Sequence, residues 1–434
     1  MNAPYRHRMS SSPHSSGITQ ADLRLGCVAH WLPKPSETFI LDEMRAIHRL
    51  HPALEIFTLY GLWRGPLSPE LSAEGLCVHR MGVRAIARII RDQIHWFQAN
   101  GPAARRLWRE VPWRKWSDPE MAGENLWAFL CGFPLARWAL ERNITHLHAC
   151  WANGPATAAW VASRLTGIPF SFSAWAGDVF PPDGALADKI RDAQFVRSTC
   201  QTFLPHLQRH AGPPPGKIQV IRNGQDPTRF LPAEPRFAPP IRLLALGRFV
   251  AKKGFETALR AAAQLDKEGV DFRLVLAGAG PQDRRLKRLA GKLGIEQHVQ
   301  FPGFVPRHRT HELFRHCDLF LMPSQIDPHG DRDGIPNVVL EALLHRIPVV
   351  ATDVGGIPEI IRDGETGRLV PPHDPAALAR AVRDMIRDPQ QARAMAARGG
   401  EQVRREYDLE TNARELLRRI ERAAFPADRE HGAP

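Results

Sequence analysis

Short apolar runs alternate with amphipathic stretches along most of the chain after residue 24. In the second half the runs lie at 241–247, 272–277, 299–303, 319–322 and 347–351, and segments with helical spacing separate them. Apolar runs without polar alternation are typical of strands that are buried on both faces. The pattern therefore predicts an α/β domain with a doubly wound parallel sheet over residues 241–405.

The first half shows the same alternation less regularly, and a proline-rich stretch separates the halves. Residues 232–240 contain four prolines in nine positions, a composition that favours an extended linker. A chain of 434 residues is too long for one core. We therefore predict one domain over residues 23–232, a linker over 233–240, and a last helix within 406–426 that crosses back to the first domain.

The first 22 residues differ from the rest in composition. They are rich in Ser, Pro and His and contain no apolar stretch. This composition predicts a disordered lead over residues 1–22 rather than a secretory signal. The six cysteines form no C-x-x-C pair, and we expect reduced thiols in a cytoplasmic protein.

Two loops that precede helices lie after neighbouring strands in the stretch 323–359. The first helix is expected over 335–344, and Gly355-Gly356 opens the second. In an open parallel sheet, ligands bind at the carboxyl ends of the strands. Helix N-termini there offer free N–H groups and a positive dipole end, which suit phosphate.

Two carboxylates frame the first of these helices with the spacing Asp-x7-Glu. Asp333 precedes the helix and Glu341 lies inside it. Carboxylates accept hydrogen bonds from vicinal hydroxyls, so the pair can hold a ribose and a sugar. For Asp333 a helix cap is an equal alternative. For Glu341, in the apolar context VVLEALL, burial is favoured over solvation, and a buried carboxylate needs a partner.

Two cations follow the first strand of the second domain. Arg248 lies at the carboxyl end of the strand and Lys253 just before the next helix. A guanidinium fork and a mobile ammonium group both suit a diphosphate. The alternative is that both are solvated surface cations.

The stretch from Asp333 to Gly356 resembles the nucleotide-binding signature of glycosyltransferase family 4, the retaining transferases of the GT-B fold. That family has Glu where this chain has Asp333, and it has Arg and Lys at positions matching 248 and 253. Asn223-Gly224 resembles the start of its Asn-Gly-x-Asp turn. The resemblance implies two Rossmann-like domains facing a cleft, with Arg248 and Lys253 stabilising the leaving diphosphate. It also implies donor contacts from Asn223, Asp333, Gly334, Ile335, Glu341 and Gly356.

The chain departs from this family at two strand ends. The family often carries His where Cys150 and Trp175 stand here, whereas Asp178 remains. Asp178 is therefore one candidate base, and the donor phosphate oxygen is another. The spacing Asp331-Arg332-Asp333 is that of a metal motif, but Asp333 fits the carboxylate that holds the donor. We expect no metal and no cofactor besides the donor.

The segment from Arg80 to Trp116 is basic and rich in tryptophan. It has nine Arg or Lys residues against two acids, a net charge of +7. Two interpretations stay open: a helix that lies on an anionic membrane surface, or a core helix with a solvated basic face. Nucleic acid is not expected, because no recognised motif accompanies the charge. The apolar stripe of this segment consists of Val83, Ile86, Ala87, Ile90, Ile94 and Phe97.

A turn after the first strand, Ser36-Glu37-Thr38, resembles the exopolysaccharide and colanic-acid branch of the same family. That resemblance implies a saccharide acceptor, lipid-linked, at the inner face of the cytoplasmic membrane. We therefore predict transfer of a sugar from a nucleotide-diphosphate sugar, with retention and without a metal. The alternatives are a non-catalytic sugar-nucleotide-binding protein and a glycoside hydrolase with paired carboxylates. Arg248 and Lys253 argue against the hydrolase.

Overall fold

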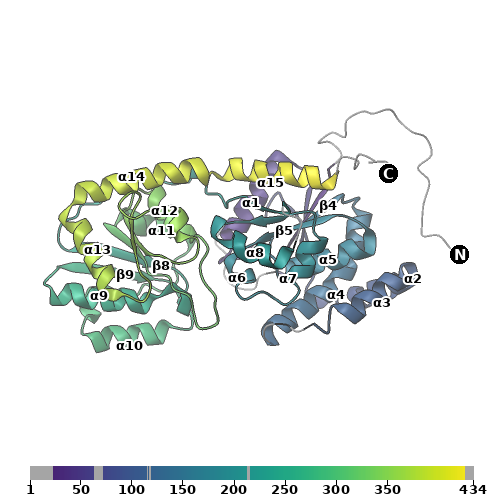
Figure 1. Ribbon diagram of the computed structural model, residues 1–434, viewed down its shortest axis with the longest axis horizontal. Helices are drawn as coiled ribbons and strands as arrows, with labels where there is room; N and C mark the ends of the chain where they lie inside the picture. Colours follow the sequence, from purple (N-terminus) through teal and green to yellow (C-terminus); the bar gives the residue numbers. More distant parts are fainter. Residues whose placement is uncertain (1–22, 63–71, 115, 117–118, 213–215, 426–434) are drawn as a thin grey trace.

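The computed structural model describes residues 23–62, 72–114, 116, 119–212 and 216–425. These residues form two lobes, each built around a parallel sheet with helices on both faces (Figure 1). The predicted fold class, two Rossmann-like α/β units, is confirmed. The predicted disordered lead over residues 1–22 lies outside the described residues.

The first lobe contains a seven-stranded parallel sheet in the order β3-β2-β1-β4-β5-β6-β7. Its strands are β1 Leu25–Ala29, β2 Leu54–Thr58, β3 Cys77–Arg80, β4 His146–Ala149, β5 Phe170–Ala174, β6 Val196–Ser198 and β7 Ile218–Val220. Its helices are α1 Thr38–Leu50, α2 Ile86–Ala99, α3 Gly101–Glu110, α4 Pro119–Glu141, α5 Gly154–Thr166, α6 Ala176–Val179, α7 Leu186–Asp192 and α8 Leu204–Ala211.

The second lobe contains a six-stranded parallel sheet in the order β10-β9-β8-β11-β12-β13. Its strands are β8 Ile241–Leu246, β9 Phe272–Ala277, β10 Val299–Gln300, β11 Leu319–Met322, β12 Val349–Thr352 and β13 Arg368–Val370. Its helices are α9 Phe255–Lys267, α10 Asp283–Leu293, α11 Arg307–Arg315, α12 Asn337–Leu344, α13 Pro375–Arg387 and α14 Pro389–Glu406.

Each sheet separates two hydrophobic cores, because successive side chains of a strand point to opposite faces. In β1, Cys27 belongs to the core under α1, whereas Val28 belongs to the core under α4 and α5. In β8, Leu243 and Leu244 divide between the two cores of the second lobe in the same way. Burial on both faces explains why these strands read as continuous apolar runs.

The last helix, α15 (Leu409–Ala424), belongs to the first lobe although it follows α14 of the second. The two helices form one band along the top of both lobes in Figure 1, and α15 packs against α1. Asp388 and Asp408 cap the two helices by accepting hydrogen bonds from Gln391 N and Thr411 N. The band therefore joins the lobes at a second place, besides the segment between β7 and β8.

Several elements differ from the sequence prediction. The helix expected from Ile335 begins at Asn337, because Pro336 is extended with ψ 127°. The helix expected after Gly355-Gly356 is a single 3₁₀ turn, Ile357–Glu359, and β10 ends at Gln300 rather than at residue 303. The edge strands β3 and β13 and the 23-residue helix α4 were not predicted. Among the described residues, no helix has the length and apolar content needed to cross a membrane.

Candidate active site

A cleft of about 1080 Å³ lies between the two lobes and is lined by residues from both. Loops at the carboxyl ends of the strands form much of its wall, and helix residues complete it. Trp31, Trp151 and Trp175 follow β1, β4 and β5, whereas Gly247-Arg248 and Gly278-Ala279 follow β8 and β9. Parallel strands place these loops at one edge of each sheet, which is where the sequence predicted a site.

Two ion pairs, one buried and one partly exposed, connect the loops of the second lobe. Lys253 Nζ lies 2.9 Å from both carboxylate oxygens of Asp333, and Ser324 Oγ donates to Asp333 at 2.6 Å. Burial alone would raise the pKa of Asp333, but Lys253 and its neighbours outweigh it and hold that pKa below its ordinary value. Lys252 pairs with Asp331 in the same way, at 2.9 Å. Each acid of the Asp-x-Asp spacing therefore faces a lysine.

Arg248 is the exposed cation of this group. It lines the cleft, and its charge contributes to a lowered pKa of Lys253, after the larger effect of burial. No salt bridge joins Arg248 to an acid within the described part of the chain. The guanidinium is therefore available to an anion in the cleft.

Glu341 is buried on α12 and faces the cleft. Burial raises the pKa of its carboxyl group to about 7, Arg307 opposes the rise, and Asp42 adds to it. Arg307 also forms an ion pair with Asp42 of α1, so this pair connects α11 to the first lobe. A carboxyl group with this pKa changes its charge near neutral pH.

Two glycine loops meet beside the cleft. Gly334 follows Asp333, and Gly356 N donates to Gly334 O at 3.2 Å. Gly355 has φ 59°, and a Cβ there would lie 1.8 Å from Asp333 O, so only glycine allows this approach. Gly334 and Ile335 line the cleft. The amide of Gly356 is bonded to Gly334, which places Gly356 behind the lining residues rather than among them.

Asn223 lies at the junction of the lobes, after β7. Its Nδ2 donates to Asn337 Oδ1 at 3.0 Å, whereas its Oδ1 is buried without a hydrogen-bond partner. A buried acceptor without a donor costs free energy, so this oxygen is an unsatisfied polar group beside the cleft. Asn223 is thus among the predicted residues that the structure brings together in the cleft.

Asp178 lies on the opposite wall, in the first lobe. Its two oxygens accept from the backbone amides of Trp175 and Ala152, and burial raises its pKa to about 8. The bond from Trp175 N is that of a helix cap, and the bond from Ala152 N ties the same carboxyl group to the loop after β4. Both oxygens of Asp178 are therefore engaged by the backbone.

Aromatic side chains also line the first-lobe wall, and they were not predicted from the sequence. Trp31 stacks on Tyr60 with ring centroids 4.1 Å apart, and Tyr60 stacks on Trp127 at 6.4 Å. His30 Nε2 lies 2.7 Å from Glu124 Oε1 beside them. Trp31 and Tyr60 come directly after β1 and β2, and this position is the signal that could have identified them.

Comparison with known proteins places the second lobe in a family. The profile described as "Glycosyl transferases group 1" matches residues 229–402. The glycogen synthase of Mycobacterium tuberculosis is 32% identical over 334 residues, which are 74% of this chain and 74% of that protein. The chain belongs to the group 1 glycosyltransferases.

Other relatives agree with this membership. The putative colanic acid biosynthesis glycosyltransferase WcaL of Salmonella typhimurium is 37% identical over 208 residues, 47% of this chain. The match spans only 51% of WcaL, so the chain covers about half the length of that relative. The crystal structure of Anabaena Alr3699/HepE in complex with UDP and glucose superposes with a TM-score of 0.68 at 19% identity, over 92% of this chain and 99% of that one. This likeness supports the GT-B fold.

The two departures noted in the sequence contact each other in this group 1 glycosyltransferase. Trp175 Nε1 donates to the backbone oxygen of Cys150 at 2.8 Å, and its ring packs on Phe39 at 4.6 Å. The Cys150 thiol is buried in the core beneath α1. An indole therefore fills the strand ends where the resembling family often has imidazoles.

A group of side chains that could hold a metal lies away from the cleft. Glu55, Cys77 and His79 place their ligand atoms within 4.8 Å of one another at the edge of the first sheet. His79 Nε2 is 2.7 Å from Glu55 Oε2, and Arg142 lies 3.6 Å from the same carboxylate. None of the three lines the cleft.

Proposed function

We propose that this protein transfers a sugar from a nucleotide-diphosphate sugar to a saccharide acceptor, as a retaining family 4 hexosyltransferase. One observation carries the proposal. Arg248 and Lys253 stand at the cleft with two buried carboxylates, Asp333 and Glu341, at the carboxyl ends of the second sheet. Cations suit the diphosphate, and carboxylates suit the hydroxyls of the sugar and the ribose.

The charges account for the bond that breaks. When the anomeric C–O bond opens, the electron pair passes to the diphosphate oxygen, where Arg248 and Lys253 stabilise the new negative charge. The acceptor oxygen then bonds to the anomeric carbon on the same face. Its proton passes to the departing phosphate oxygen, because Asp178 is engaged by two amides. In this proposal the two cations supply the stabilisation, and no metal takes part.

The acceptor side of the proposal rests on the aromatic wall. The apolar C–H face of a pyranose ring can pack on Trp31 or Trp127, while its hydroxyls reach the Glu124 carboxylate, which lines the same wall. WcaL, by its name, acts in colanic acid biosynthesis. We infer an exopolysaccharide or cell-surface glycan acceptor that is lipid-linked, used at the inner face of the cytoplasmic membrane.

The proposal is tested by a thermal-shift panel with UDP, GDP and ADP. A ligand at 100 times its dissociation constant stabilises the folded state by about 2.7 kcal/mol, so one diphosphate should raise the Tm clearly. Arg248→Ala should abolish that rise without changing the Tm of the free protein, because Arg248 is exposed. No rise with any nucleoside diphosphate would contradict the proposal.

A non-catalytic sugar-nucleotide-binding protein is the second candidate. The observation that favours it is the capping role of Asp178 beside Trp175, which leaves the first-lobe wall without a free carboxylate at that position. Such a protein would show the same thermal shift but no acceptor-dependent release of nucleotide.

A further inference from the structure

The helix α2 carries a row of large apolar side chains on its solvent-facing side. Ile90 and Ile94 are 55% and 54% exposed, and Ile86 and Phe97 continue the row along the helix. Val83, in the turn before the helix, is exposed as well. Positions 86, 90, 94 and 97 recur at intervals of three or four residues, so they form one stripe. We call Val83, Ile86, Ile90, Ile94 and Phe97 the outer stripe.

The helix α2 packs on the lobe through a different face, so the outer stripe is not the face that joins α2 to the core. Ile89, Asp92 and Trp96 are buried against α4. Trp96 Nε1 donates to Phe133 O at 3.1 Å, and Asp92 pairs with Arg137 at 3.0 Å. These contacts fix the rotation of the helix. The interpretation of this segment as a core helix with a solvated basic face is therefore wrong for the stripe, since the apolar residues face outward.

Basic side chains flank the outer stripe. Arg84 is exposed in the 3₁₀ turn before α2, and Arg91 is exposed on α2, where its Nε lies 3.2 Å from Asp92. Arg105 and Arg109 are exposed on the following helix α3. Only two acids lie between residues 80 and 116. Asp92 is buried, and Glu110 is paired with Arg106 at 2.6 Å. The surface thus combines apolar and positive groups with little compensating negative charge.

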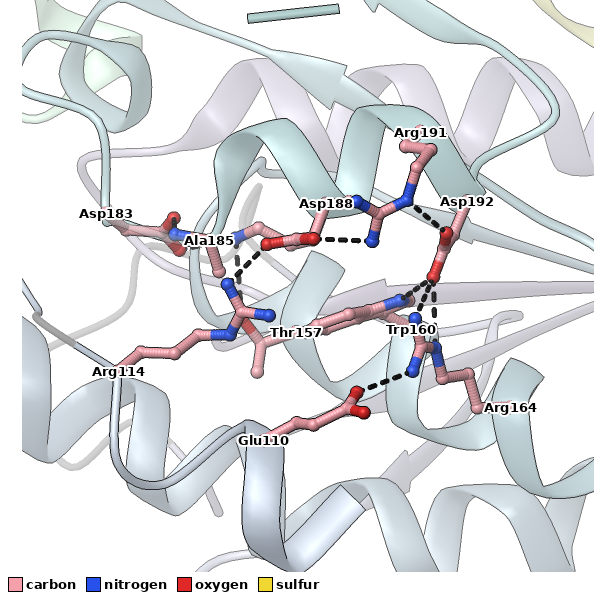
Figure 2. A network of polar contacts seen from close by, with 11 residues as sticks. Glu110, Arg114, Thr157, Trp160, Arg164, Asp183, Ala185, Asp188, Arg191 and Asp192 are labelled. Atoms are coloured by element: carbon pink, nitrogen blue, oxygen red, sulfur yellow. Dashed lines mark hydrogen bonds and ion pairs between the residues drawn. The ribbon is translucent and has the colours of Figure 1, made fainter. Parts of the chain in front are cut away.

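A network of polar contacts holds α3 against the rest of the lobe (Figure 2). Arg164 of α5 joins Glu110 at 3.0 Å and Asp192 at 2.6 Å, and Trp160 Nε1 donates to the same Asp192 at 2.7 Å. Arg114 pairs with Asp188 of α7. Trp113, the residue before Arg114, has 78% of its surface exposed. The network therefore fixes α3 and the turn that carries Trp113, while the contacts of Trp96 and Asp92 with α4 fix α2.

We propose that the outer stripe and its flanking arginines dock the protein on an anionic phospholipid bilayer. The helix α2 lies in the plane of the surface, its apolar row enters the boundary between headgroups and acyl chains, and the arginines meet the phosphates. A second protein copy would have to cover this face with acidic groups, whereas the exposed charges here are basic. The proposal deepens the lipid-linked acceptor proposed above, but its surface is independent of the donor site.

The test is co-sedimentation of the full chain with vesicles of phosphatidylcholine alone or mixed with phosphatidylglycerol. Binding should require the anionic lipid and weaken as salt rises, because the Debye length shortens. Ile90→Gln with Ile94→Gln should reduce binding at least tenfold at all salt concentrations. Arg84→Gln with Arg105→Gln should weaken it mainly at low salt. All four side chains are exposed, so the Tm of both variants should equal that of the wild type.

Matched controls keep the outcome specific. Leu231→Gln removes an exposed leucine from the segment between β7 and β8. Arg405→Gln with Arg418→Gln removes two exposed charges from α14 and α15, which run along the top of Figure 1, away from α2 and α3. Both should bind as the wild type does. Equal binding by the Ile90→Gln/Ile94→Gln variant would overturn the proposal. The proposal would also be overturned if the wild type did not bind vesicles but formed a dimer in solution that the Ile90→Gln/Ile94→Gln variant could not form. A normal thermal shift with nucleotide but no vesicle binding would refute only the docking surface and would remain consistent with the proposed donor site.

Discussion

Lys253 and Asp333 form one buried ion pair, in which the ammonium nitrogen lies 2.9 Å from both carboxylate oxygens. The sequence had assigned these residues to two different groups of the donor, the diphosphate and the sugar. Their contact implies that a donor must share Lys253 between its phosphate and Asp333. It also implies that substitution of either residue changes stability as well as binding.

The exposed cation gives the cleaner test of the diphosphate contact. Arg248→Ala should lower kcat/KM about 100-fold, because a lost donor to a developing oxyanion costs about 3 kcal/mol. Since Arg248 is exposed, the Tm should not change. Steady-state kinetics with the cognate donor measures the effect, and Arg248→Lys should recover part of it. Near-normal turnover in the alanine variant would remove Arg248 from the diphosphate site.

Substitution of the buried cation, Lys253, should lower stability as well as turnover. Lys253→Ala leaves Asp333 charged and unpaired in a buried position, which costs about 3–5 kcal/mol of unfolding free energy. Adding Asp333→Asn should restore much of that stability, because the uncompensated charge is gone, but it should not restore turnover. Urea unfolding and kinetics on the same three proteins separate the two effects. Recovery of activity in the double variant would show that Lys253 acts only through Asp333.

Glu341 predicts a pH dependence of donor binding. Its pKa is raised to about 7 in the folded protein by burial, so the charged, hydrogen-bond-accepting form grows as pH rises from 6 to 8. The donor dissociation constant should fall over this range. Between the ordinary pKa of a glutamate and pH 7, Glu341 binds fewer protons in the unfolded chain than in the folded protein. Its contribution to the free energy of unfolding should therefore fall as pH rises through that window.

Calorimetry across this pH range measures the first effect. In Glu341→Gln the neutral amide cannot titrate, so binding should be weaker at pH 8 and nearly independent of pH. A variant with the same pH dependence as the wild type would assign the titration to another group. It would return Glu341 to a structural role in α12.

The aromatic wall predicts a selective loss on the acceptor side. Trp31→Ala should raise the acceptor KM about fivefold to tenfold, since an aromatic contact contributes about 1 kcal/mol, and should leave the donor dissociation constant unchanged. Trp31→Phe keeps a ring that can stack and should recover most of the loss. An equal effect on donor and acceptor would mean that Trp31 shapes the whole cleft rather than the acceptor side.

Turnover should persist in a metal chelator, because the proposed charge stabilisation uses Arg248 and Lys253 alone. A metal at Glu55, Cys77 and His79 would act on stability instead, since that group lies outside the cleft lining. Kinetics and Tm in chelator, with and without added magnesium or manganese, distinguish these effects. Loss of turnover that magnesium or manganese restores would contradict the metal-free mechanism.

The sequence predicted the second lobe well because its signals are local. Buried strands such as Leu319–Met322 read as apolar runs, and the loop residues that follow them gather at one sheet edge by topology alone. The helix start at Asn337 was missed because Pro336 is equally suited to a first turn and to an extended residue.

Contacts between distant segments could not be predicted in this way. The stacking of Trp31, Tyr60 and Trp127 joins loops after β1 and β2 to the long helix α4, and nothing local marks that meeting. The outer stripe posed a related problem. Periodicity showed that Ile86, Ile90 and Ile94 share a face, but only the packing of Trp96 on the opposite side shows that this face points outward.

Sugar transfer from a nucleotide-diphosphate sugar should be visible as release of nucleotide that depends on the acceptor. UDP-, GDP- and ADP-sugars are each incubated with lipid-linked saccharide acceptors. The diphosphate released is measured for the wild type and for Arg248→Ala. We expect one donor to be consumed only when acceptor is present, and its diphosphate to be the one that raises the Tm. The Arg248→Ala variant should be about 100-fold slower. A diphosphate that raises the Tm while no donor turns over with any acceptor would refute sugar transfer and identify a non-catalytic binding protein.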